Sequence, residues 1–197
     1  HYGQAKALTE IELKKLPVSS PTTIILRPPL IWGGEMPALD TYEQAVKAGQ
    51  AIWVDGGKRI LDRVHVDNLV HALTLALTKG KDKEIYFVTD DDPSSVKEFF
   101  SSLLATRGLT QGNRSMPLSL VLPMSNLMEN IWKLRGSKTP PPITRFFAEA
   151  ISRDRIYNIS KIKQELGYQP IVSAKQGLAE MYTSARLLNT AKQTQLV

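Results

Sequence analysis

The order of hydrophobic and polar positions predicts a chain that mixes helices with short strands. Residues 2–16 contain no helix breaker before Pro17, so a helix is expected at the start. Residues 22–34 follow as an apolar, β-branched run, which predicts a buried strand ending at two prolines and a glycine pair. A helix that leads into a buried strand with a loop at its carboxyl end is typical of α/β proteins, in which ligands bind beyond the strand ends.

The rest of the pattern predicts an alternation of short elements. Strands are expected at 51–54, 60–66, 85–89 and 156–159, and helices at 42–48, 68–78, 94–107 and 161–166, while 145–151 fits a helix or a loop. Asp67 is the expected N-cap of helix 68–78, with Leu69, Leu73 and Ala76 on its buried face. Helix 94–107 is expected to bury Val96, Phe99, Phe100, Leu103 and Leu104; Gly108 and Gly167 are expected to end their helices.

Tyr2 and Lys6 are the residues with the clearest chemical meaning. Four residues apart on a helix, their side chains lie on one face. A cation beside a phenol favours the phenolate, which lets tyrosine transfer protons near neutral pH. The same spacing also occurs on surface helices as a solvated pair, and this is the structural alternative.

Composition and charge restrict the function classes. Of the 197 residues, 42% are hydrophobic, which suffices for a globular core, and the lack of cysteine excludes disulfides and thiol chemistry. The net charge of +6 is scattered and not interleaved with aromatic residues, so a solvated surface is expected rather than a nucleic-acid site. Three widely spaced histidines predict no metal site.

Residues 116–134 form the most apolar window of the chain. Two prolines, two asparagines and a glutamate interrupt it, so it falls short of a spanning helix. A core or lid helix is one interpretation. The other is an apolar wall for a lipid-like substrate, or a peripheral contact with a membrane.

Four motifs occur in an order that is specific when taken together. They are the Y-x-x-x-K of Tyr2 and Lys6, LRPPLIWG at 26–33, VHVDN at 64–68 and ELGYQP at 165–170. With these motifs the chain resembles an extended short-chain dehydrogenase/reductase. The segments HVDNLVHA at 65–72 and IYFVTD at 85–90, followed by Pro93, are most similar to the 3β-hydroxysteroid dehydrogenase and sterol dehydrogenase branch of these epimerase/dehydratase-like enzymes.

The resemblance implies an α/β fold: the C-terminal part of a Rossmann-type doubly wound parallel sheet with a smaller α+β substrate-binding region. Residues 1–36 would hold the catalytic helix and a late strand of the nucleotide sheet. Residues 37–197 would be mainly substrate-binding, with helix 67–79 and strand 85–89 returning to the sheet. The family's glycine-rich turn and active-site serine lie upstream of the tyrosine, and no G-x-x-G-x-x-G occurs here. We therefore expect the C-terminal part of a longer enzyme, with an exposed sheet edge that makes the isolated chain unstable or prone to associate.

The resemblance also assigns roles to individual residues. Tyr2 would exchange a proton with the substrate oxygen, and Lys6 would lower the pKa of Tyr2 and bind the nicotinamide ribose. Pro28 and the backbone of Ile31 match positions that face the nicotinamide of NAD or NADP. Trp32 stands beside the expected substrate, although a core aromatic is the alternative. His65 is a candidate substrate contact, although a structural histidine is the more common case.

The expected reaction is hydride transfer between a nicotinamide cofactor and a secondary alcohol or ketone of an apolar substrate. Nucleotide-sugar epimerases and dehydratases of this superfamily tend to carry a phosphate-binding arginine where this chain has Leu61, which favours the apolar substrate. Arg59 and Arg63 lie nearby on the same side of the expected strand, so the sugar-nucleotide alternative stays open, as does a non-catalytic binding module. The resemblance further allows a homodimer, located in the cytoplasm or on the cytoplasmic side of a membrane.

Overall fold

A computed structural model of the chain describes residues 2–17, 21–134 and 145–194. The chain folds into two compact units, and each unit is built from three segments of the sequence. Unit 1 comprises His1–Trp32, Arg63–Asp91 and Tyr157–Ser173. Unit 2 comprises Gly33–Asp62, Asp92–Ile156 and Ala174–Val197.

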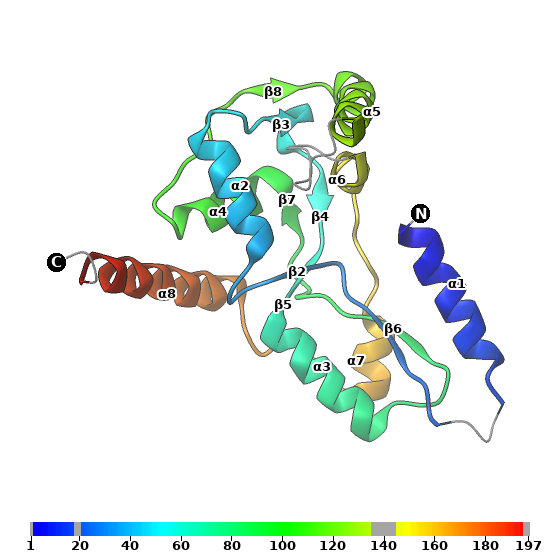
Figure 1. Ribbon diagram of the computed structural model, residues 1–197. Helices are drawn as coiled ribbons and strands as arrows, with labels where there is room; N and C mark the ends of the chain where they lie inside the picture. Colours follow the sequence, from blue (N-terminus) through cyan, green and yellow to red (C-terminus); the bar gives the residue numbers. More distant parts are fainter. Residues whose placement is uncertain (1, 18–20, 135–144, 195–197) are drawn as a thin grey trace. The chain divides into compact units, whose positions relative to one another are not determined.

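In the part of unit 1 that the structure describes, the strands form two parallel pairs (Figure 1). Strand β1 (Ile25–Arg27) pairs with β6 (Ile85–Phe87), and β2 (Leu30–Trp32) pairs with β5 (Arg63–His65). Parallel strands with helical connections confirm the predicted α/β class. The strand expected over 22–34 is instead two short strands, because the consecutive prolines 28 and 29 lack the N–H groups that a continuous ladder needs. The residues of β1 are half-buried rather than buried.

Among the described residues of unit 1, three segments are helical: α1 (Tyr2–Lys15), α3 (Val66–Lys79) and α7 (Ser160–Leu166). The expectation that Asp67 caps α3 is wrong. Strand β5 passes directly into the helix, so His65 is the N-cap, and its Nδ1 accepts a hydrogen bond from the Asp67 N–H at 3.3 Å. The buried face of α3 agrees with the prediction at Ala76, and Leu69 packs against the core, but Leu73 is 46% exposed and Asn68 and Ala72 are buried in addition.

The core of unit 1 is formed by residues of β5, α3, β6 and α7, together with single residues next to β6 and α7. Its buried members are Val64, Ala72, Ala76, Tyr86, Val88, Ile159, Ile162, Leu166 and Tyr168. Helix α7 ends as predicted at Gly167, whose left-handed backbone (φ 71°) satisfies the carbonyls of the last turn. The Lys79 ammonium at the end of α3 donates to the Leu166 carbonyl at 3.2 Å, which ties the two helix ends together.

Unit 2 combines helices with very short strands. The helices are α2 (Pro37–Lys47), the 3₁₀ turn η1 (Asp55–Gly57), α4 (Val96–Ala105), α5 (Leu118–Leu134), α6 (Arg145–Ala150) and α8 (Ala174–Thr194). Strand β3 (Trp53–Val54) pairs in parallel with β8 (Ser115–Met116), and β4 (Ile60–Leu61) pairs antiparallel with β7 (Ser94–Ser95). Helix α2 begins five residues earlier than the expected 42–48, because Pro37 suits the first helical turn.

Other expectations for unit 2 have mixed outcomes. Helix α4 buries the five apolar residues predicted for it, and its N-cap Ser95 accepts from the Glu98 N–H at 3.1 Å. No strand forms at 156–159; an isolated bridge joins Leu61 to Arg155, the residue just before this segment. Residues 145–150, open between helix and loop, are helical.

Helix α5 covers most of the apolar window 116–134. Val121 is fully buried with Val54 and Ala148, whereas Leu120 and Leu127 are 57% and 60% exposed. One face of α5 therefore belongs to the core of unit 2, and the membrane contact stays a prediction. Within the described residues, no helix is both long enough and apolar enough to cross a membrane.

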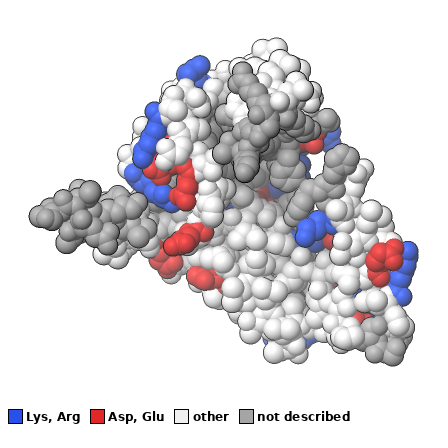
Figure 2. Space-filling view, in the orientation of Figure 1, with Lys and Arg blue, Asp and Glu red and all other residues white. Residues whose placement is uncertain are grey.

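Charged side chains do not gather into one patch on the face in Figure 2. Lysine and arginine occur there in small groups, several of them beside aspartate or glutamate. This distribution agrees with the solvated surface inferred from the sequence.

Candidate functional site

Helix α1 presents Lys6 and Glu10 on neighbouring turns of one face. The Glu10 carboxylate pairs with Arg27, whose Nε donates to Glu10 Oε1 at 2.9 Å. This hydrogen bond lowers the pKa of Glu10, and the carboxylate in turn raises the pKa of Arg27. Because Arg27 is the last residue of β1, the ion pair turns this face of α1 toward the carboxyl end of that strand.

Tyr2 is the first residue of α1, and its backbone is helical. Its side chain lies outside the described atoms, so the predicted pairing with Lys6 rests on the helical spacing. The Lys6 side chain is exposed. Two turns separate Tyr2 from Glu10, and four residues separate Lys6 from each of them, so all three occupy adjoining positions along one side of the helix.

The loop after β1 holds the two predicted nicotinamide positions. Pro28 is half-buried between β1 and β2, and Ile31 in β2 is 43% exposed. Strands β2 and β5 run in parallel, with Ile31 opposite Val64 and Trp32 opposite His65. Their carboxyl ends therefore share one edge, which is where ligands bind in α/β folds.

Trp32 and His65 end these two strands and lie inside unit 1. They are 1% and 2% exposed, and their rings meet edge to face with centroids 4.8 Å apart. These contacts give both rings a structural role. Their predicted contact with substrate stays a prediction.

Asp90 is a residue that the sequence reasoning missed. It lies just beyond β6, is 7% exposed and accepts three hydrogen bonds. The donors are Trp32 Nε1 to Oδ2 at 2.6 Å, and both His65 N (2.8 Å) and Asn68 Nδ2 (2.7 Å) to Oδ1. One buried carboxylate thus holds the ends of β2 and β5 and the first turn of α3.

Asn68 extends this network and is also fully buried. Besides Asp90, its Nδ2 donates to the Val172 carbonyl at 2.8 Å, and its Oδ1 accepts from the N–H groups of Ile171 and Val172, each at 2.8 Å. The amide therefore uses both of its hydrogens and both lone pairs of its oxygen. The sequence offers no local signal for this role, because Asn68 lies in the first turn of α3, where polar residues are common.

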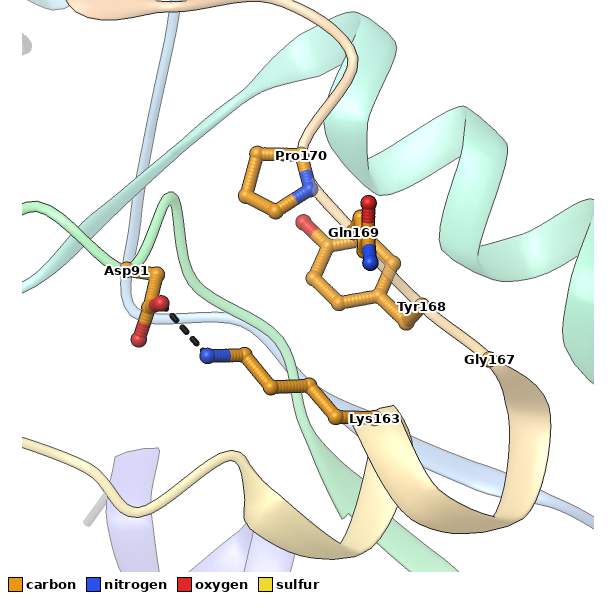
Figure 3. A pocket seen from close by; sticks show the side chains of 6 residues that line it. All are labelled: Asp91, Lys163, Gly167, Tyr168, Gln169 and Pro170. Atoms are coloured by element: carbon orange, nitrogen blue, oxygen red, sulfur yellow. Dashed lines mark hydrogen bonds and ion pairs between the residues drawn. The ribbon is translucent and has the colours of Figure 1, made fainter.

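A pocket of about 420 Å³ opens beside this network (Figure 3). Asp91, Lys163, Gly167, Tyr168, Gln169 and Pro170 line it. Lys163 and Asp91 form an ion pair across it, and the Tyr168 hydroxyl donates to the Thr89 carbonyl at 3.0 Å. Burial, together with the nearby carboxylates of Asp90 and Asp91, raises the pKa of Tyr168, so this phenol is a structural donor rather than a base.

The two arginines considered as ligands for a phosphate, Arg63 and Arg59, differ in burial. Arg63 is 4% exposed in β5, in register with Leu30. Arg59 in unit 2 is partly exposed, with its guanidinium 4.0 Å from the Asp55 carboxylate. Leu61 is buried in β4.

Comparison with known proteins gives relatives over nearly the whole chain. A ketoreductase of *Stigmatella aurantiaca*, named for 4-hydroxy-2-methyl-3-oxo-4-farnesyl-3,4-dihydroquinoline-1-oxide, is 31% identical over 158 residues, which are 80% of this chain and 47% of the relative. The decarboxylating sterol-4-alpha-carboxylate 3-dehydrogenase of *Dictyostelium discoideum* is 29% identical over 184 residues, 91% of this chain and 56% of the relative. The chain thus spans about half the length of these relatives.

Among solved structures, a UDP-glucuronic acid 4-epimerase from *Bacillus cereus* in complex with NAD is similar in fold. Its TM-score is 0.58 at 18% identity, with 93% of this chain and 50% of the epimerase covered. The sequence model of the 3-beta hydroxysteroid dehydrogenase/isomerase family matches residues 12–120. Because this match takes in more than half of the chain, the protein belongs to the 3-beta hydroxysteroid dehydrogenase/isomerase family.

Proposed function

We propose that the protein is an NAD(P)-dependent oxidoreductase that transfers hydride between the nicotinamide and a secondary alcohol or ketone of an apolar substrate. Tyr2 is the acid–base group and Lys6 its activating cation. Residues 1–36 carry the catalytic helix and a strand of the nucleotide sheet, and the later segments mainly bind substrate.

The observation that carries this proposal is the direction of one face of α1. The pair between Glu10 and Arg27 turns the side of the helix that includes Lys6 toward the carboxyl end of β1. Pro28 and Ile31, the residues proposed to face the nicotinamide, follow directly along the chain. A solvated surface pair would not need this orientation.

The groups present suit the nicotinamide end of a dinucleotide. The exposed ammonium of Lys6 can donate to ribose hydroxyls, while the half-buried Pro28 and the exposed side chain of Ile31 offer an apolar surface to a flat ring. When bound, the cofactor supplies the hydride acceptor or donor.

Proton transfer is the part of the reaction assigned to this chain. During oxidation, the hydroxyl proton of the alcohol would pass to the Tyr2 phenolate oxygen, with the hydride acceptor supplied by the bound cofactor, and a ketone would be left. Lys6 keeps a positive charge beside that oxygen and favours the phenolate. Reduction reverses both transfers.

An apolar substrate is favoured by the relatives and by Leu61. The names of the two relatives include a farnesyl group and a sterol, which are large apolar groups. Leu61 is buried and uncharged, and Arg59 already lies near Asp55. The likeness to an epimerase concerns the fold alone. Conversion of a nucleotide sugar is therefore the second candidate and not the first. Peripheral membrane contact through 116–134 and a homodimer belong to the same proposal.

The test is NADH formation from apolar secondary alcohols by the protein encoded by the complete reading frame. Tyr2→Phe should lower kcat about 100-fold or more. Tyr182→Phe is the matched control, because Tyr182 is 47% exposed in α8. Retention of activity by Tyr2→Phe would refute the assignment, and conversion of a nucleotide sugar without net NADH would support the second candidate.

A further inference from the structure

The Asp90 carboxylate holds two strand ends that the proposed site depends on. Its Oδ2 accepts from the Trp32 indole and its Oδ1 from the His65 backbone, so one side chain fixes the last residues of β2 and β5. The Asp90 N–H also donates to the Arg63 carbonyl at 2.8 Å. Asp90 is thereby held through its backbone as well as through its carboxylate.

The position of Ile31 depends on these contacts. Ile31 precedes Trp32, and β2 has three residues, so fixing the indole limits the freedom of the peptide that carries Ile31. The edge-to-face contact between Trp32 and His65 couples the two strand ends a second time. Buried charge-assisted hydrogen bonds are stronger and more directional than neutral ones, which suits a positioning role.

We propose that Asp90 is a positioning residue: through Trp32 it fixes the strand-end backbone at Ile31 against which the nicotinamide is oriented for hydride transfer. This proposal rests on the proposed function. In this role Asp90, which is 7% exposed, acts through Trp32 rather than by contact with cofactor or substrate. Its effect on the reaction is geometric, so it should appear in kcat more than in KM.

Asp90→Asn in the full-length protein tests this role. Asparagine keeps an oxygen for the His65 N–H and Asn68, but its NH₂ group faces the indole N–H of Trp32, donor against donor. We expect kcat to fall about tenfold or more while the alcohol KM changes less than about threefold. The ¹⁵N-indole NMR signal of Trp32 should shift at the same time, because its charged acceptor is lost.

Asp91→Asn is the matched control. It removes a neighbouring carboxylate that pairs with Lys163 and does not touch Trp32, and asparagine tolerates the positive φ of 57° at this site. Its kcat and its indole signal should stay as in the unmodified protein. Unchanged kcat in folded Asp90→Asn, or equal losses in both variants, would overturn the proposal.

Trp32→Phe tests the same positioning role independently, and it can be used even if Asp90→Asn does not fold. It leaves the carboxylate in place and removes only the indole donor along with one ring. We expect the same selective loss of kcat, and we expect Asp90→Asn to cost less in the Trp32→Phe background than alone. Equal costs in both backgrounds would refute action through Trp32. If the unmodified protein forms no NADH, the proposed function fails; an active protein indifferent to Asp90→Asn rejects the positioning role alone.

Discussion

Replacing Asn68 with alanine should destabilise unit 1 strongly. The substitution removes four hydrogen bonds, two donated by Nδ2 and two accepted by Oδ1, from a side chain that is fully buried. A typical hydrogen bond contributes about 0.5–1.5 kcal/mol net, and an unsatisfied buried partner costs about 1–3 kcal/mol. Water can replace part of the loss at Ile171, which is 57% exposed, and Asp90 keeps the His65 N–H. We therefore expect a loss of about 2–4 kcal/mol.

Urea unfolding and amide hydrogen exchange measure this effect together. Exchange of the Ile171 and Val172 amides should accelerate first, because Asn68 accepts their hydrogen bonds directly. Asn130→Ala is the control, since Asn130 is an exposed residue of α5. A loss below about 0.5 kcal/mol, the size of an ordinary surface substitution, would refute the reasoning.

Asn68→Asp sharpens the same test. Its carboxylate can still accept from the two amides, but its second oxygen faces Asp90 and the Val172 carbonyl without a proton to donate. Repulsion between the two acids predicts a variant at least as unstable as Asn68→Ala at neutral pH, with part of the stability regained on acidification. A pH-independent deficit would contradict the role assigned to the amide hydrogens.

Three further predictions follow from single contacts. His65→Ala should cost about 2–4 kcal/mol in urea unfolding, because it removes a helix cap and a buried ring, whereas Asp67→Ala at its exposed position should cost less than about 1 kcal/mol; equal losses would contradict the His65 cap. Arg27 lowers the pKa of Glu10, so the pair stabilises the attachment of α1 at pH values above the ordinary carboxyl pKa, and this stabilisation is lost as the pH falls through the lowered pKa. The protection of the α1 amides from hydrogen exchange should therefore fall at low pH. Glu10→Gln should abolish this pH dependence. Gly80→Ala should lower the thermal midpoint, because the new Cβ would lie 2.5 Å from the Ala76 carbonyl oxygen, while Gly3→Ala, where an added Cβ meets no described atom within 4 Å, should not.

Local patterns predicted many of the elements. The five apolar residues of α4 recur at helical spacing, and all of them are buried, because the apolar face of an amphipathic helix packs against the core. Gly167 ends α7 because glycine adopts the left-handed backbone without strain. The family resemblance, read from four ordered motifs, agrees with the match over residues 12–120.

Errors arose where the packing of neighbouring elements, rather than residue type, decided the role of a residue. Asp67 has the residue type of an N-cap. However, β5 ends at His65 and α3 begins at the next residue, so His65 occupies the N-cap position. Leu73 fits the apolar period of α3 and is exposed, whereas the unpredicted Asn68 and Ala72 face inward beside the predicted Ala76. The 156–159 segment has strand-like residues but forms no strand, and the nearby isolated bridge is made by Arg155, just before it.

The sequence by itself determined the α/β class, the family and the spacing of Tyr2 and Lys6, because these depend on residue type and short-range period. Only the tertiary structure decided that Asp90 joins the ends of β2 and β5, and that Asn68 joins α3 to residues 171 and 172. Those contacts link residues 25 to 104 positions apart. No local pattern encodes such pairs, since they form only when the packed core brings the strand ends together and leaves each buried polar group in need of a partner.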